Sequence, residues 1–371
     1  MSPFNSRWGA WGWLWRSSCC LAVATPTVPR TLAPQVVVGQ VVDAASAAPV
    51  GEGFVVLLDE QGREIARTLT GGDARFLLRA PGPGRYQLRS ERIGYVALVG
   101  PAFTLEQDQT LTHQLPVMAL ALQLAAVEVT GRTTCRLNPD RALATAAVWE
   151  EVRKALAAAV WTARQPAYRY RAVEYRRDWE FARGARTETS DTLVGHWRAL
   201  WVSRPAAELA ERGYIRTEGD STAYYGPDAG VIQDSTFLGS HCFTLASRSA
   251  SGATQVGLAF EPEPRRRLPD VRGILWIDQR TGELRVLDYH YTRVPAGLDD
   301  DRIGGKIEFL RLPSGAWIVQ RWQIRMPRVG LEMFRLPSGY EERRLRVVGF
   351  RERGGEVLEV RALDGRIVYP W

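Results

Sequence analysis

One short stretch of the sequence gathers the residue types that acid–base or nucleophilic chemistry requires. It contains Asp228, Asp234, His241 and Cys242. A carboxylate can orient a histidine ring, and the histidine can then activate a nucleophile or carry a proton. The stretch therefore permits a hydrolase that acts through Asp228, Asp234 and His241. The alternative, which we favour, is turn chemistry, because Asp228 follows Gly-Pro and a cysteine beside a strand is commonly a packing or disulfide residue.

The histidines do not form a zinc-ligand pattern. They are His113, His196, His241 and His290, and none has a glutamate or a second histidine at the spacing that a zinc peptidase needs. The sequence also lacks a Gly-x-Ser-x-Gly elbow, a phosphate-binding loop and a dinucleotide fingerprint. We therefore predict a protein that is not an enzyme and that needs no metal and no cofactor.

Aromatic residues recur along the predicted hairpins of the C-terminal half. Aromatic faces on a concave sheet can stack on sugars or line a lipid groove, whereas in a sheet covered by helices they form the core. The core interpretation is favoured, and the ligand-binding interpretation is retained as a candidate. The candidate ligand-binding residues are Trp276, Tyr289, Tyr291, Trp317 and Trp322.

Length and composition indicate a globular protein with two domains. The chain has 371 residues, of which 45% are hydrophobic and 24% charged. The net charge of +7 comes almost wholly from arginine, because Lys154 and Lys306 are the only lysines. The longest basic run is Arg265 to Arg267, in a proline-rich loop, and no recognition module accompanies it. We therefore expect no nucleic-acid partner.

The first 34 residues resemble a secretory leader. Arg7 precedes a tryptophan-rich apolar run and then small residues, although Arg16 interrupts the apolar run and makes the signal atypical. The alternatives are a wrongly assigned start and a disordered tail. A leader predicts an extracytoplasmic location, in the periplasm or cell envelope, with membrane association only through this segment if it is not cleaved. In that compartment Cys135 and Cys242 would form a disulfide, whereas in the cytosol both would be buried thiols.

Residues 35–118 have the pattern of a small antiparallel sandwich, in which short apolar runs alternate with Gly, Pro and Asp clusters. The motifs that recur in it are VGQVVD at 38–43, PV at 49–50, GDARF at 72–76, PGRY at 83–86 and IGY at 93–95. These motifs resemble the carboxypeptidase regulatory-like domain. The resemblance implies a transthyretin-like, seven-stranded sandwich with a carbohydrate-binding-like fold, and an accessory role in the cell envelope. A carboxypeptidase itself is disfavoured because no zinc-ligand motif is present.

A linker over residues 119–134 is predicted to lead to an α+β domain over residues 135–371. Asn138 and Pro139 suit the start of a helix that reaches about Trp161, and a shorter helix is expected at Ala206–Arg212. Long hairpins follow, the last of them with strands at 345–351 and 357–363 joined by a turn at Gly354 and Gly355. The predicted fold is thus mainly β: the sandwich, then a curved antiparallel sheet with a packed helix.

These observations predict a non-enzymatic binding or scaffold protein of the cell envelope. Its partner would be an envelope protein, a glycan or a lipid. One alternative is a carbohydrate- or lipid-binding module that uses the curved sheet, and another is the hydrolase with Asp228, Asp234 and His241.

Overall fold

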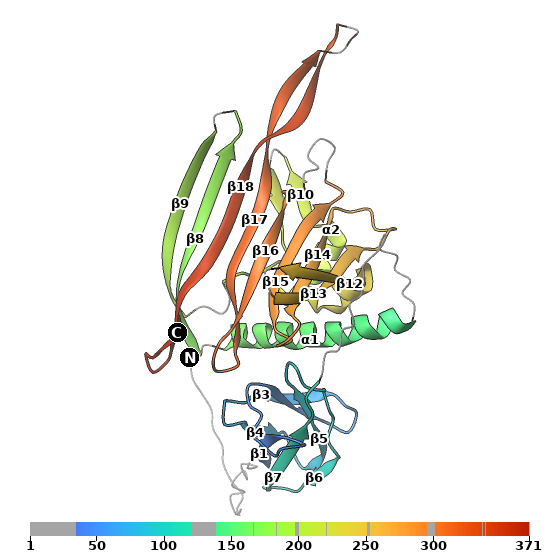
Figure 1. Ribbon diagram of the computed structural model, residues 1–371, viewed down its shortest axis with the longest axis vertical. Coiled ribbons are helices and arrows are strands. Elements are labelled where there is room, and N and C mark those ends of the chain that lie inside the picture. The colour runs from blue at the N-terminus through green and yellow to red at the C-terminus, as the bar shows by residue number, and fades with distance from the viewer. Residues whose placement is uncertain are drawn as a thin grey trace, which may run out of the picture. The chain divides into compact units, whose positions relative to one another are not determined.

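The computed structural model describes residues 35–120, 139–165, 167–182, 184–196, 200–219, 221–250, 253–294, 301–335, 337 and 339–370. One compact unit spans Pro34–Trp371. The fold is mainly β, as predicted (Figure 1). The predicted leader and most of the predicted linker lie outside the described residues, and the predicted domain boundaries stay a prediction.

Seven strands form the predicted sandwich. They are β1 (Gln35–Asp43), β2 (Phe54–Leu58), β3 (Glu64–Leu69), β4 (Arg75–Ala80), β5 (Gly84–Glu91), β6 (Phe103–Leu105) and β7 (Thr110–Val117). One sheet has the order β4-β1-β7 and the other the order β3-β2-β5-β6. β1 pairs antiparallel with β4 but parallel with β7. The seven-stranded sandwich that the sequence motifs imply is thus confirmed.

Strand β2 is buried on both faces, whereas a strand at the surface of a domain has one face exposed to solvent. Val55 and Leu57 belong to the sandwich core. Phe54, Val56 and Leu58 belong to a second core, which they share with helix α1 (Pro139–Arg164) and the large sheet. An uninterrupted apolar run is the sequence that a strand covered on both sides requires. β2 therefore joins the two cores of the molecule.

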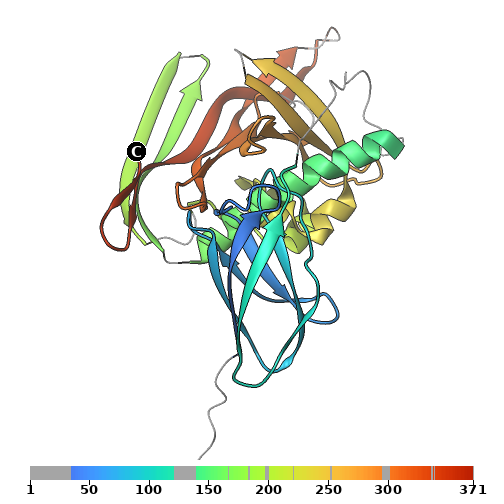
Figure 2. The same cartoon turned by 60° about the horizontal axis from the view of Figure 1, so that its bottom comes forward.

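Most strands after the sandwich form one long antiparallel sheet with the order β12-β13-β14-β15-β16-β17-β18-β8-β9, and β19 pairs with β18. The sheet curves strongly (Figure 2). Its strands are β8 (Tyr168–Glu180), β9 (Ala185–Gly195), β12 (His241–Ala250), β13 (Ala253–Pro262), β14 (Asp270–Asp278), β15 (Leu284–Thr292), β16 (Gly304–Arg311), β17 (Trp317–Arg335), β18 (Glu341–Ala362) and β19 (Ile367–Tyr369).

Helix α1 crosses one face of this sheet and contacts β12, β13, β15 and β17. Its apolar side buries Val148, Val152 and Leu156 in the shared core. The remaining elements are α2 (Ala206–Arg212), β10 (Ile215–Glu218), β11 (Ser221–Tyr224), α3 (Ala229–Ile232) and α4 (Ser235–Ser240). α3 packs on α1, and α2 packs on α4. The predicted packed helix and curved sheet are therefore confirmed.

The predicted turn at Gly354 and Gly355 is wrong, because both residues lie inside the continuous strand β18. A Cβ atom on Gly354 would be 2.5 Å from the phenol of Tyr175, and one on Gly355 would be 2.7 Å from the indole nitrogen of Trp322. The two glycines let aromatic rings lie directly on the backbone of the strand. The two glycines allow the aromatic rings to approach the backbone closely, and they do not form a turn.

Candidate functional site

The carboxylates proposed for a hydrolase cap helices. Asp228 accepts hydrogen bonds from the backbone N–H of Val231 at 2.9 Å and of Ser203 at 2.8 Å. Asp234 accepts one from the N–H of Thr236 at 2.8 Å. Aspartate at these positions satisfies backbone donors that the first turn of a helix leaves free. Both residues therefore already have structural partners.

His241 lies beside a carboxylate that the sequence pattern did not indicate. Its Nε2 lies 3.3 Å from Oδ1 of Asp270, and the two side chains are only 1% and 0% exposed. Asp270 also binds the guanidinium of Arg266, and the His241 ring stacks on Phe237. Within the described part of the chain, His241 makes no hydrogen bond or ion pair with Asp228 or Asp234. The convergence that the hydrolase hypothesis requires is therefore not found.

Cys242 is bonded in a disulfide. The other cysteines of the chain, Cys19, Cys20 and Cys135, lie outside the described residues. The pairing of Cys135 with Cys242 stays a prediction.

The five aromatic residues singled out from the sequence are all buried. Their exposed fractions are 7% for Trp276, 1% for Tyr289, 5% for Tyr291, 3% for Trp317 and 6% for Trp322. All except Trp276 belong to the core that α1 shares with the sheet. Burial raises the pKa of Tyr289 above the ordinary tyrosine value. Only Trp317 lines the apolar cavity described next, so the ligand-binding role of this set stays a prediction.

An apolar cavity of about 310 Å³ lies where the last turns of α1 meet the large sheet. Cavities of this size with mainly apolar linings are typical of small-molecule sites. Three segments of the chain contribute most of the wall. They are residues 159–160 and 162–164 of α1, residues 200–202, and residues 317–319 of β17; Tyr170, Asp228, Ala229, Gly230 and Val357 complete it.

Two contacts hold the wall in place. The buried hydroxyl of Thr162 accepts a hydrogen bond from the backbone N–H of Trp317 at 3.3 Å, which ties the helix to the start of β17. The ring of Trp201 stacks on that of Trp322 with the ring centroids 4.5 Å apart. These contacts join α1, β17 and the segment that carries Trp201 around one space.

Few polar groups reach this space. Burial raises the pKa of Tyr170, so its phenol stays protonated at neutral pH. The indole N–H of Trp201 is buried and has no hydrogen-bond partner among the described residues. Asp228 is engaged by backbone donors, as described above. Arg164 is exposed at the end of the helix. The cavity is therefore suited to an apolar ligand, with polar groups only at its border.

A second cavity, of about 650 Å³, has a different character. Glycines 273, 304 and 305 and Trp276 contribute to its lining. Charged residues also line it, and several are already paired, as Lys306 is with Glu308 at 2.8 Å and Arg325 with Glu352 at 2.8 Å. Because these charges are satisfied within the chain, this cavity gives weaker grounds for a ligand than the apolar one.

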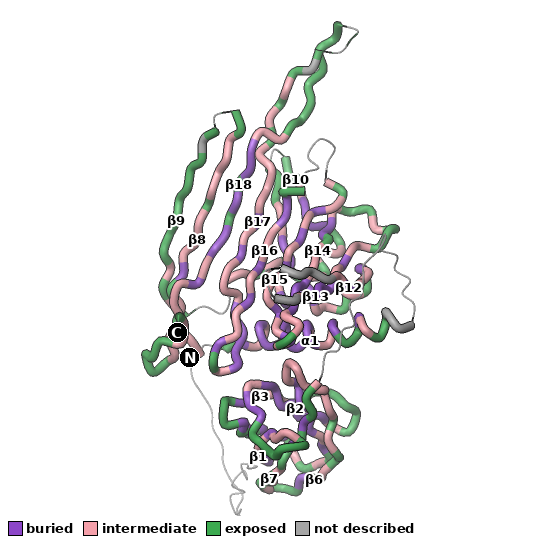
Figure 3. Tube along the Cα trace, viewed as in Figure 1, coloured by how far each residue is buried: buried purple, intermediate pink, exposed green. Residues whose placement is uncertain are grey.

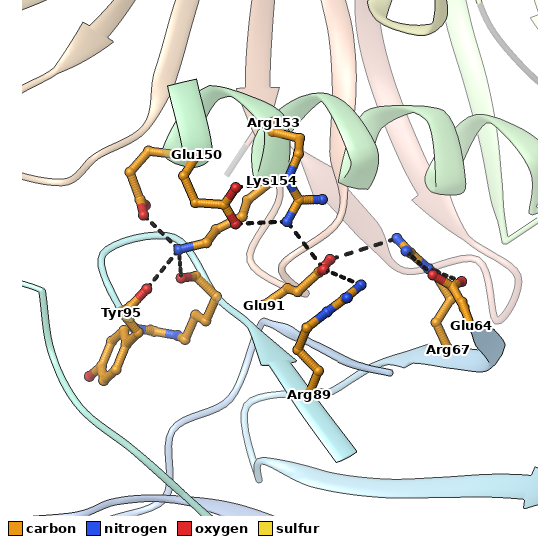
Figure 4. Close-up of polar contacts among 10 residues, drawn as sticks. Glu64, Arg67, Arg89, Glu91, Tyr95, Glu150, Arg153 and Lys154 are labelled. Atoms are coloured by element: carbon orange, nitrogen blue, oxygen red, sulfur yellow. Dashed lines mark hydrogen bonds and ion pairs between the residues drawn. The ribbon is translucent and has the colours of Figure 1, made fainter. Parts of the chain in front are cut away.

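The middle of α1 binds the sandwich through a buried lysine (Figure 4). The ammonium group of Lys154 donates to the Glu151 carboxylate at 2.6 Å and to the carbonyl oxygens of Tyr95 and Arg92 at 2.6 and 3.1 Å. Glu151 in turn accepts from the backbone N–H of Gly94 at 2.7 Å. Lys154 and Glu151 are 2% and 0% exposed. The loop after β5 is therefore fixed to the helix by a fully partnered ion pair.

A charge-balanced network continues this interface (Figure 4). The buried Glu91 of β5 lies 2.7 Å from Arg89 and 3.2 Å from Arg153 of α1. Arg153 also binds Glu150, and this hydrogen bond is the main cause that raises the pKa of the guanidinium. Desolvation opposes ionisation of Glu150, but Arg153 outweighs it and lowers the pKa of that carboxyl. Glu150 and Arg153 are thus both charged at neutral pH.

Comparison with known families and structures recognises the sandwich. Residues 36–118 match the model of the carboxypeptidase regulatory-like domain. No curated protein matches the chain. The resemblance drawn from the sequence motifs is therefore confirmed for this region, and no family model matches the C-terminal region.

Similar solved structures include three bacterial proteins. The TIE protein of Bacillus anthracis is 11% identical with a TM-score of 0.21, over 43% of this chain and 26% of that one. A DUF1329 family protein from Desulfovibrio piger is 12% identical with a TM-score of 0.28, over 60% and 94%. BcpA, the major pilin subunit of Bacillus cereus, is 8% identical with a TM-score of 0.21, over 90% and 91%. The chain thus spans about a quarter of the TIE protein, and none of these likenesses supports a functional argument.

Among the described residues, no helix combines the length and the apolar character needed to cross a membrane.

Proposed function

We propose that this protein is a non-enzymatic binding protein of the cell envelope and that it holds an apolar ligand between α1 and the curved sheet. The observation that carries the proposal is the apolar cavity lined by Trp201, Trp317 and Val319. The envelope location is supported by the carboxypeptidase regulatory-like domain and by the leader predicted from the sequence.

The lining favours an acyl chain over a sugar. A sugar presents hydroxyl groups around its whole ring, and each buried hydroxyl without a partner costs free energy. The wall is formed chiefly by the side chains of Ala, Val, Leu, Ile and Trp. An unbranched hydrocarbon chain has no hydroxyl groups that need hydrogen-bond partners, and its binding gains free energy from every methylene that leaves water. The sandwich then acts as an accessory module that is fixed to the binding domain through Lys154.

The test is a binding titration with the fluorescent fatty acid cis-parinaric acid and the full chain. We expect saturable binding that palmitate displaces and maltose does not. Ala163→Phe places a ring in the cavity and should weaken binding by about tenfold or more, which corresponds to ~1.4 kcal/mol. Ala147→Phe is the matched control, because Ala147 is exposed on the same helix and does not line the cavity.

Far-UV circular dichroism and the unfolding midpoint of each variant show whether Ala163→Phe still folds. If a folded Ala163→Phe protein binds the fatty acid as well as the unaltered chain does, the cavity is not the site. Displacement by maltose and not by palmitate would instead support the carbohydrate alternative.

A further inference from the structure

The β17–β18 hairpin extends beyond the rest of the sheet (Figure 1). β17 loses its neighbour β16 after the pair Gly304 and Arg325. β18 pairs with β8 only from Gly349 onward. Between these points, in residues 327–348, β17 and β18 form strand pairs only with each other among the described residues. This segment, which we call the distal hairpin, is therefore a two-stranded ribbon.

One face of the distal hairpin is apolar. The register places Val329 opposite Val347, Leu331 opposite Leu345 and Met333 opposite Arg343, all on the same face. Apart from the half-buried Val347, these apolar side chains are exposed, as the outer part of the hairpin is in Figure 3. The exposed fractions are 41% for Val329, 67% for Leu331, 51% for Met333, 50% for Leu345 and 77% for Tyr340 at the turn.

The opposite face is polar, and most of its charges are paired within the hairpin. Arg346 lies 2.7 Å from Glu332 of the other strand, and Arg344 lies 2.7 Å from Glu342. Of the charged residues on this face, only Arg328 makes no ion pair among the described residues. The distal hairpin is thus an amphipathic ribbon with one largely paired polar face and one apolar face in water.

The apolar face also carries more cations than anions. Arg335 and Arg343 lie on it by register together with Glu341, and neither arginine makes an ion pair within the described part of the chain. The distal hairpin contains five arginines and three glutamates, so its net charge is +2. Single exposed apolar residues are common on protein surfaces, but a contiguous apolar stripe on an isolated ribbon indicates a contact surface.

We propose that the distal hairpin docks on the surface of an anionic lipid bilayer. Leu331, Met333 and Leu345 would enter the boundary between headgroups and acyl chains, as the apolar side of an interfacial amphipathic element does. Arg335 and Arg343 would bind the phosphates of the headgroups, and this electrostatic attraction would strengthen binding to the bilayer. Tyr340 has the amphipathic ring that is enriched at this depth of a membrane.

The test is co-sedimentation of the full chain with vesicles of phosphatidylcholine that contain phosphatidylglycerol, and with vesicles of phosphatidylcholine alone. We expect binding to the anionic vesicles and a partition coefficient at least fivefold lower for Leu331→Ser/Met333→Ser. Leu363→Ser is the matched control, because Leu363 is also 67% exposed but lies outside the distal hairpin. All variants retain the N-terminal segment, so any difference between them arises from the hairpin.

A second pair of variants tests the electrostatic contribution of the arginines to membrane binding. Arg335→Gln/Arg343→Gln should lower the partition coefficient about fivefold or more on anionic vesicles, because each arginine near an anionic surface contributes measurably to binding. Arg85→Gln/Arg366→Gln removes the same charge from exposed positions elsewhere and should have little effect.

The proposal is overturned if Leu331→Ser/Met333→Ser binds like the unaltered chain, if Leu363→Ser reduces binding equally, or if neutral vesicles bind as well as anionic ones. It is also overturned if sedimentation velocity shows a dimer that Leu331→Ser/Met333→Ser abolishes, since the apolar face would then contact a second copy. Binding of cis-parinaric acid should be unchanged in all hairpin variants, so this test is independent of the cavity.

Discussion

At the scale of single residues, glycines mark the places where aromatic rings lie against the backbone. The hydroxyl of Tyr289 lies 2.0 Å from the position that a Cβ atom would take on Gly226, and 2.3 Å from that on Gly305. The ring therefore occupies space that only two glycines leave free. In the sequence, Gly226 precedes Pro227 and is typical of a turn. Its packing role could not be predicted, because Tyr289 lies on a distant strand.

Gly226→Ala should destabilise the protein by about 1–3 kcal/mol, the usual cost of forcing extra volume into a packed core. The added methyl group would collide with the buried Tyr289 ring, which is itself held by the core. Urea unfolding of the full chain measures the effect. Gly239→Ala is the control, because no atom lies within 4 Å of the Cβ position at Gly239. Equal midpoints for Gly226→Ala and the unaltered chain would contradict the proposed packing.

The candidate catalytic stretch shows what local spacing can and cannot predict. Asp228 was recognisable as a turn residue because it follows Gly-Pro, and both Asp228 and Asp234 cap helices in the structure. His241 lies against Asp270, which begins a strand two positions away in the sheet. No sequence spacing connects them, because the pairing of β12, β13 and β14 brings them together. The sequence therefore indicated the histidine as a candidate residue but did not indicate the carboxylate that lies beside it.

At the scale of elements, α1 has two roles along its length. Glu151 and Lys154 in its middle bind the sandwich, and Ala159, Thr162 and Ala163 near its end line the cavity. The sequence predicted the helix and its start within a residue, since Asn138 and Pro139 are typical start signals. It did not predict the interface, although β2 offered a signal: an apolar run without alternation indicates a strand covered on both faces.

Lys154→Met should destabilise the protein by about 3–5 kcal/mol, because it leaves the Glu151 carboxylate buried without its cation. It also removes the donor to the carbonyl groups of Arg92 and Tyr95, so hydrogen exchange should increase in the loop between β5 and β6. Lys306→Met is the natural control, as Lys306 is the only other lysine. It is 39% exposed and pairs with Glu308 at the surface, where such a pair contributes about 0–1 kcal/mol.

Equal losses of stability for the two lysine variants would contradict the buried interface. A large loss of stability for Lys154→Met without faster hydrogen exchange at residues 92–95 would place the effect of the substitution inside the helix and not at the contact with the sandwich.

At the scale of the whole molecule, the sandwich and the curved sheet share a continuous core through β2. The sequence predicted both folds, because strand alternation, turn residues and the motifs of the regulatory-like domain are local features. It did not predict the continuous strand β18, whose two adjacent glycines imitate a turn. It also did not predict the cavity, which arises only when α1, β17 and the segment around Trp201 come together.

The central claim is that an apolar ligand lies between the end of α1 and the sheet. Photo-crosslinking of the full chain with a diazirine derivative of palmitic acid, followed by peptide mapping, tests it most directly. We predict that the label attaches to peptides that contain residues 159–164, 200–202 or 317–319, and that excess palmitate suppresses it. Label confined to the sandwich, to the second cavity or to the distal hairpin, or label that palmitate does not suppress, would contradict the claim.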